Sequence, residues 1–187
     1  STDKSNTTST KLNSNKNAIA QKRELTEVKD AADRLYEAAG KLTDTSSSKS
    51  LFKKADKVTN DITSAVKDYV KNYNSLIEEA ADTTNSKVTG KVSFMTGQAN
   101  AYKSSLEKVG ITINSDKTLS IDEDTFKKSD ISDVKKLFNG SGSMAYQTFV
   151  RASDISSAAE NASTSVTSYG ADGMYNNYYN SAYNWYL

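Results

Sequence analysis

Apolar residues recur at steps of three and four along several long stretches of the chain, the spacing that places them on one face of an α-helix. These stretches cover residues 25–42, 51–81, 92–109 and 143–165. Heptad spacing suits either coiled-coil contacts between molecules or the core of one bundle. Because the connections between the stretches are short, we expect the stripes to pack against one another within one bundle.

After Gly110 the hydrophobic period changes from about 3.6 to 2. Residues 111–113 and 119–121 alternate between apolar and polar side chains, and the turn-forming sequence Ser-Asp-Lys stands between them at 115–117. This pattern predicts a short β-hairpin at about residues 110–122. Gly110 itself suits the left-handed backbone conformation that ends many helices.

The predicted fold is mainly α: an elongated helical bundle of three to four long helices with one short β-hairpin, over residues 18–166. Residues 1–17 include twelve Ser, Thr or Asn residues and one large apolar residue. Such a segment buries too little surface to offset its ordering entropy, which predicts a flexible polar tether. Residues 167–187 form a Tyr- and Asn-rich tail that we expect to dock on the bundle or on an interface.

The composition excludes much of the chemistry that enzymes use. The chain contains no Cys, His or Pro. Without Cys and His there is no thiolate nucleophile, disulfide, imidazole base or typical transition-metal site. We therefore expect no enzymatic activity, no cofactor and no metal site. The acidic residues at 122–124, 130 and 133 lack the spacing of a calcium loop, since Lys127 stands sixth, and are better explained as helix caps.

The charge pattern disfavours nucleic acid and membranes as partners. The net charge is +1, and 21 of the 24 basic residues are Lys, whereas readers of phosphate and bases rely on Arg. The sequence also has no run of about 20 apolar residues that could span a membrane.

Aromatic residues are the least ordinary feature of the sequence. Tyr69, Tyr73 and Tyr102 lie on helical stripes and are predicted to be core residues with the hydroxyl at the rim. The tail could fold back onto the bundle, bury in a subunit interface, stack on sugar rings or remain unstructured. Its candidate partner-binding residues are Tyr175, Tyr178, Tyr179, Tyr183, Trp185 and Tyr186.

Two motifs go beyond generic bundle patterning. The first is AVKDYVKNYNSLI at 65–77. The second comprises LEKVGI at 106–111, TLSIDE at 118–123, Phe126, and DVKKLFNG at 133–140. In this order they resemble the C-terminal, inner-domain region of the flagellar hook-associated protein 2 family, the filament cap (FliD) proteins, over about residues 51–150. That family usually carries Asp-Gly in the hairpin turn, where this chain has Asp-Lys.

The resemblance implies a secreted, extracellular structural protein of the bacterial flagellum or cell surface. Such a protein acts by protein–protein contacts with copies of itself or with flagellin-like or hook-associated proteins, and it needs no catalytic residue or cofactor. The alternative is a surface-displayed binding or adhesion module that recognises a glycan or a host protein through the aromatic tail.

Overall fold

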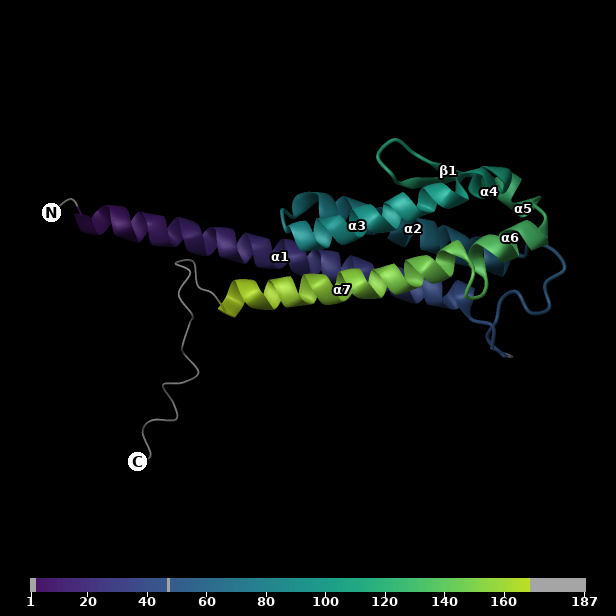
Figure 1. Cartoon of the computed structure of the whole chain (residues 1–187), viewed down its shortest axis with the longest axis horizontal. Coiled ribbons are helices and arrows are strands. Elements are labelled where there is room, and N and C mark those ends of the chain that lie inside the picture. The colour runs from purple at the N-terminus through teal and green to yellow at the C-terminus, as the bar shows by residue number, and fades with distance from the viewer. Residues whose placement is uncertain (1–2, 47, 169–187) are drawn as a thin grey trace, which may run out of the picture.

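The computed structural model describes residues 3–46 and 48–168, and it is mainly α with one short β-hairpin, as predicted. The molecule is elongated, and its helices run nearly along one long axis (Figure 1). Within the described residues, no helix combines the length and the apolarity needed to cross a membrane. The elements in order are α1 (Asp3–Thr43), α2 (Asn60–Asp82), α3 (Ser86–Ala99), the 3-10 turn η1 (Asn100–Tyr102), α4 (Lys103–Lys108), β1 (Ile111–Ile113), β2 (Leu119–Ile121), α5 (Glu123–Lys127), α6 (Ile131–Phe138) and α7 (Met144–Ser168).

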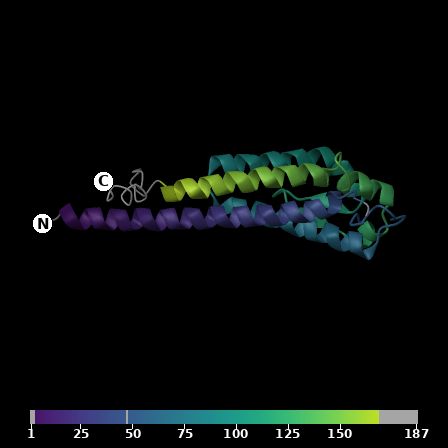
Figure 2. The same ribbon diagram turned by 90° about the horizontal axis from the view of Figure 1, so that it is seen from below.

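The long helices α1 and α7 lie side by side and antiparallel (Figures 1 and 2). Small residues such as Ala39, Ala152 and Ala159 are fully buried, which lets the two backbones approach closely. The hydroxyl of Ser156 donates a hydrogen bond to the Asp33 carboxylate and sets the register between the two helices. The heptad stripes therefore pack within one chain over the bundle, as expected.

The predicted flexible tether at residues 1–17 is wrong over residues 3–17, because α1 begins at Asp3. No Gly or Pro occurs before Gly40, so nothing interrupts the helix between Asp3 and that residue. The packed part of α1 already supplies the costly nucleus, and extending a formed helix is far easier than starting one.

The predicted helical start near Leu51 is also wrong, since α2 begins at Asn60. Thr59 has an extended backbone, and its hydroxyl accepts a hydrogen bond from the Ile62 N–H at 3.1 Å, which caps α2 at this point. The preceding loop is anchored by Phe52, which is buried in the core. Lys135 of α6 holds the same loop through a 3.0 Å hydrogen bond to the Ala55 carbonyl.

The third predicted helix is divided into α3, η1 and α4, and the hairpin follows directly. Gly110 has φ +80°, the left-handed conformation predicted for it. The strands β1 and β2 pair antiparallel, with Ile111 opposite Ile121 and Ile113 opposite Leu119. The N-cap predicted at Asp122 is confirmed, since its carboxylate accepts a hydrogen bond from the Thr125 N–H.

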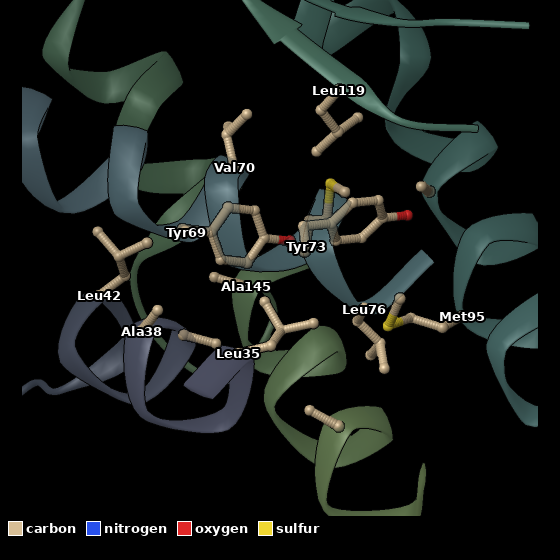
Figure 3. Close-up of a cluster of buried hydrophobic side chains, with 14 of the residues drawn as sticks. Leu35, Ala38, Leu42, Tyr69, Val70, Tyr73, Leu76, Met95, Leu119 and Ala145 are labelled. Atoms are coloured by element: carbon tan, nitrogen blue, oxygen red, sulfur yellow. The ribbon is translucent and has the colours of Figure 1, made fainter. Parts of the chain in front are cut away.

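Buried side chains of α2 pack against residues of α1, α3, α7 and the hairpin, as Figure 3 shows for part of the core. Tyr69 and Tyr73 are fully buried there, so the prediction of hydroxyls at the rim is wrong for both. It fits Tyr102 better, which is half-buried and accepts a hydrogen bond from Gln147. The Tyr69 ring packs edge-on against Phe138, which joins the first motif to the second.

Candidate assembly surface

The first part of α1 projects beyond the bundle. Antiparallel pairing sets Ser156 of α7 against Asp33 of α1, and α7 ends twelve residues after Ser156. The equivalent position on α1, twelve residues before Asp33, is Gln21. Residues 3–20, here called the stem, thus extend past the end of α7, by ~27 Å at 1.5 Å per residue. Figures 1 and 2 show α1 continuing beyond the end of α7.

Two large apolar side chains lie exposed on the stem. Leu12 is 54% exposed and Ile19 is 70% exposed. They are seven residues apart, so they share one side of the helix, and this side is opposite to the stripe that faces the bundle core. We call Leu12 and Ile19 the outer stem face.

The other side of the stem borders a cleft. The cleft has a volume of about 1130 Å³ and lies between the stem, the last turns of α7 and the start of α3. Ala18 and Gln21 line it from α1, Ala162 lines it from α7, and Lys87 and Lys91 line it from α3. Figure 1 shows that α3 begins and α7 ends at the same end of the bundle.

A smaller hollow of about 260 Å³ adjoins the cleft on the α3 side. It is bordered by Phe94, which is 55% exposed and carries the Arg151 guanidinium 4.7 Å from its ring centre. The guanidinium also pairs with Asp154, at 3.2 Å, and its Nε donates to the Gln98 side chain. This contact holds α3 against α7. No pattern in the sequence predicts that Phe94 pairs with Arg151.

A second exposed aromatic group lies on the α1–α7 pair. The rings of Tyr36 and Phe149 stack with centroids 4.2 Å apart, and Tyr146 continues the stack at 6.2 Å from Phe149. Tyr36 and Tyr146 are partly exposed. The spacing of these three residues along α1 and α7 places them beside the buried stripe of each helix. Only the register of α1 against α7 brings the three rings together.

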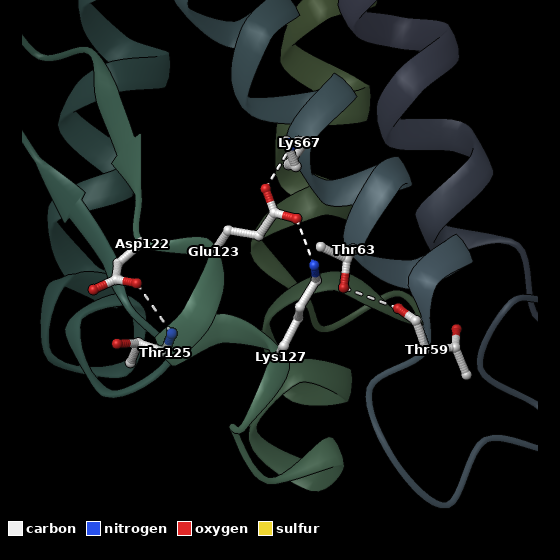
Figure 4. A network of polar contacts seen from close by, with 7 residues as sticks. All are labelled: Thr59, Thr63, Lys67, Asp122, Glu123, Thr125 and Lys127. Atoms are coloured by element: carbon white, nitrogen blue, oxygen red, sulfur yellow. Dashed lines mark hydrogen bonds and ion pairs between the residues drawn. The ribbon is translucent and has the colours of Figure 1, made fainter.

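The acidic residues after the hairpin act in capping and ion pairing (Figure 4). The Glu123 carboxylate pairs with Lys67 of α2 and with Lys127 of α5, each at 2.6 Å. Asp130 accepts a hydrogen bond from the Ser132 N–H and caps α6. In residues 3–46 and 48–168, no cluster of three or more acidic side chains could hold a metal ion.

The buried tyrosines do not form a reactive site. Burial raises the pKa of both Tyr69 and Tyr73 well above the ordinary value, so both stay protonated. Tyr69 donates its hydrogen bond to Thr148, because the single Thr148 hydroxyl proton is given to the Met144 carbonyl. Both hydroxyls lie inside the core, where no substrate could reach them.

The predicted partner-binding tail lies outside the described residues. Tyr175, Tyr178, Tyr179, Tyr183, Trp185 and Tyr186 all belong to residues 169–187, so their role stays a prediction. Of the features described above, the sequence singled out Leu12 only as an isolated apolar residue. Ile19 could have been found with it, since the two are one heptad apart in a polar segment.

Comparison with protein-family models, with curated proteins and with solved structures finds no match to this chain.

Proposed function

We propose that the protein is an extracellular structural component that works by helix-mediated assembly, in the manner of the flagellar filament cap proteins it resembles. The observation that carries this proposal is the outer stem face. Two large aliphatic side chains, Leu12 and Ile19, lie exposed at heptad spacing on a helix that continues past the bundle.

The composition of the stem indicates that its helix needs packing against a partner to be stable. Ten of its 18 residues are Ser, Thr or Asn, which are poor helix formers in a helix interior. Most helical stability in proteins comes from packing an apolar face against another element. For the outer stem face, a helix from a second subunit or from a flagellin-like protein would supply that packing.

The motif residues support the same proposal through the architecture. Tyr73 and Leu76 of the first motif are fully buried, and Phe126 and Phe138 of the second pack edge-on against each other. The motif residues thus belong to the packed core of the bundle. Location at a bacterial flagellum or cell surface follows from the resemblance alone.

The alternative, a glycan- or host-binding module, depends on the aromatic tail. Because the tail lies outside the described residues, no observation on the bundle favours this alternative over assembly.

The test is the mass of the full chain in solution, measured by light scattering over a range of concentrations, with and without flagellin from the same organism. We expect concentration-dependent oligomers or a flagellin complex. The double variant Leu12→Glu/Ile19→Glu should lose that association while keeping its helical circular dichroism signal, because both side chains are exposed in the single chain.

The matched control is Asn13→Glu/Ala20→Glu. These residues are also seven apart on the stem, but they lie on a different side of the helix. The control should associate like the wild type. A wild-type chain that stays monomeric at every concentration and ignores flagellin would refute the proposal.

A further inference from the structure

The cleft between the stem, α7 and α3 is an open groove in the surface of the molecule. Its volume of about 1130 Å³ is above the usual size of small-molecule sites. Most of its lining is small or amide side chains, and its charged residues are Lys87, Lys91 and Asp154, which pairs with Arg151. Such a surface suits a polypeptide segment better than a small charged ligand.

We propose that residues 169–187 of the same chain fill this cleft. The helix α7 ends at Ser168, and Ser165 and Val166 in its last turn already line the cleft. The described chain therefore ends at a helical turn that lines the cleft. A segment of 19 residues can reach about 60 Å when extended, whereas the α1 side of the cleft, from Ser14 to Gln21, is only ~10 Å long.

The chemistry of the lining matches the composition of the segment. Residues 169–187 contain six Tyr, one Trp and four Asn among 19 residues. A tyrosine needs an apolar surface for its ring and a hydrogen-bond partner for its hydroxyl. The cleft offers both, since Ala18, Ala158 and Ala162 alternate with the amides of Gln21 and Asn161.

The charges also match. Lys87 and Lys91 stand on the α3 side of the cleft, and both are exposed. Residues 169–187 include Asp172 and no Lys or Arg. The two ammonium groups can therefore pair with a carboxylate or lie over aromatic faces, which attract cations.

This occupant leaves the proposed function untouched. Ser14 and Ala18 line the cleft from one side of the stem, whereas Leu12 and Ile19 lie on the opposite side. A filled cleft would brace the base of the stem against α7 and leave the outer stem face open to a partner.

Trp185 makes the proposal testable in the full chain, because it is the only Trp in the sequence. Its fluorescence reports on residues 169–187 alone. We expect wild-type emission shifted to the blue of N-acetyl-tryptophanamide, weak quenching by acrylamide, and both properties independent of protein concentration. Emission and quenching equal to those of the free amide would overturn the proposal.

Two single variants disturb the cleft without touching the core. Ala18→Glu places a carboxylate in it, and Lys87→Glu reverses a charge at its rim. Each should shift Trp185 emission to the red and increase acrylamide quenching. The controls Ala20→Glu, on another side of the stem, and Lys103→Glu, exposed on α4, should behave like the wild type.

Two further outcomes are informative. One distinguishes a segment of the same chain from that of a second copy in the cleft, and the other separates cleft filling from assembly through the outer stem face. Burial of Trp185 that appears only at high protein concentration would mean insertion into a second copy and would overturn the intramolecular proposal. Leu12→Glu/Ile19→Glu should leave Trp185 fluorescence unchanged, so a failure of assembly and a failure of cleft filling give different results. If neither Ala18→Glu nor Lys87→Glu changes the fluorescence of Trp185, residues 169–187 do not occupy the cleft and the proposal is refuted.

Discussion

The side-chain amide of Asn74 on α2 is hydrogen-bonded twice to the main chain of Leu119 on β2, 45 residues later in the sequence. Its Nδ2 donates to the Leu119 carbonyl at 2.8 Å, and the Leu119 N–H donates to its Oδ1 at 2.7 Å. The amide thus takes the place of a neighbouring strand for one residue of a two-stranded sheet. These two hydrogen bonds attach the hairpin to α2. They give Asn74 of the first motif a structural role.

Asn74→Ala should therefore loosen the hairpin. It removes both partners of Leu119, whose side chain is buried, and leaving buried polar groups unpaired costs about 1–3 kcal/mol. We expect the free energy of unfolding in urea to fall by about 2 kcal/mol. Amide hydrogen exchange at Leu119 should become faster in the same variant.

Asn100→Ala is the matched control, because Asn100 is exposed at the end of α3. It should change the free energy of unfolding by no more than about 0.5 kcal/mol, as surface substitutions usually do. Equal unfolding midpoints for the Asn74 and Asn100 variants would show that the hairpin does not depend on this amide.

The two core tyrosines should respond oppositely to loss of the hydroxyl. Tyr73 has no hydrogen-bond partner for its buried hydroxyl within the part of the chain that the structure describes. Tyr73→Phe should therefore leave stability unchanged or raise it by about 1 kcal/mol, because a desolvated group is removed. Tyr69→Phe loses the 2.7 Å bond to Thr148 and should lower stability by about 1 kcal/mol.

Thermal or urea unfolding of the two variants side by side checks this prediction, since each change removes one oxygen from the same helix. A Tyr73→Phe variant that is the less stable of the two would mean that its hydroxyl has a partner after all.

The ion pairs of Glu123 should make the stability of the contact between α2 and α5 depend on pH in the acid range. Hydrogen bonds from Lys127 and Lys67, together with their charges, lower the pKa of Glu123 from 4.5 to about 2. A carboxylate whose pKa is depressed on folding stabilises the fold above its unfolded pKa, and that contribution is lost as pH falls through the folded pKa. We therefore expect it to decline from about pH 4.5 and to be gone below about pH 2.

Glu123→Gln should flatten this part of the profile when unfolding is measured from pH 7 to pH 2. Asp124→Asn is the control: Asp124 is exposed on the same helix, and neither Lys67 nor Lys127 is ion-paired with it. The control should keep the wild-type slope, and an unchanged slope in Glu123→Gln would contradict the assignment.

The hairpin and its flanking caps could be predicted from the sequence because their signals are local. The change of period after Gly110 and the capping carboxylate of Asp122 act within a few residues. The start of α2 could not be predicted, because the stripe of residues 51–58 continues the helical spacing, whereas Phe52 burial and the bond from Lys135 hold that segment in a loop. Tertiary contacts there override the local pattern.

The candidate surfaces depend on lengths that no local pattern sets. The stem projects because α7 ends opposite Gln21, and the cleft exists because α3 begins near the same level. The heptad spacing of Leu12 and Ile19 was visible in the sequence, but its meaning required knowing that residues 3–17 are helical.

The hairpin turn contains a strained residue that a single substitution should relieve. Lys117 has φ +73°, the one positive φ at a residue other than Gly in the described residues. A left-handed conformation costs an L-residue roughly 1–2 kcal/mol, and the greater unfolded-state freedom of Gly offsets about 0.5–1 kcal/mol of the relief. Lys117→Gly should therefore raise the free energy of unfolding by up to about 1 kcal/mol.

Substitutions at two glycines with positive φ provide a comparison for this prediction. Gly140 has φ +83° and open space around it, so Gly140→Ala should lose only the left-handed preference. Gly110 has φ +80°, and an added Cβ would lie 2.8 Å from the Cβ of Thr125, so Gly110→Ala should be clearly the more damaging. Urea unfolding of all three variants should rank Lys117→Gly above the wild type, then Gly140→Ala, then Gly110→Ala. A Lys117→Gly variant less stable than the wild type would show that the lysine makes a compensating contact in the turn.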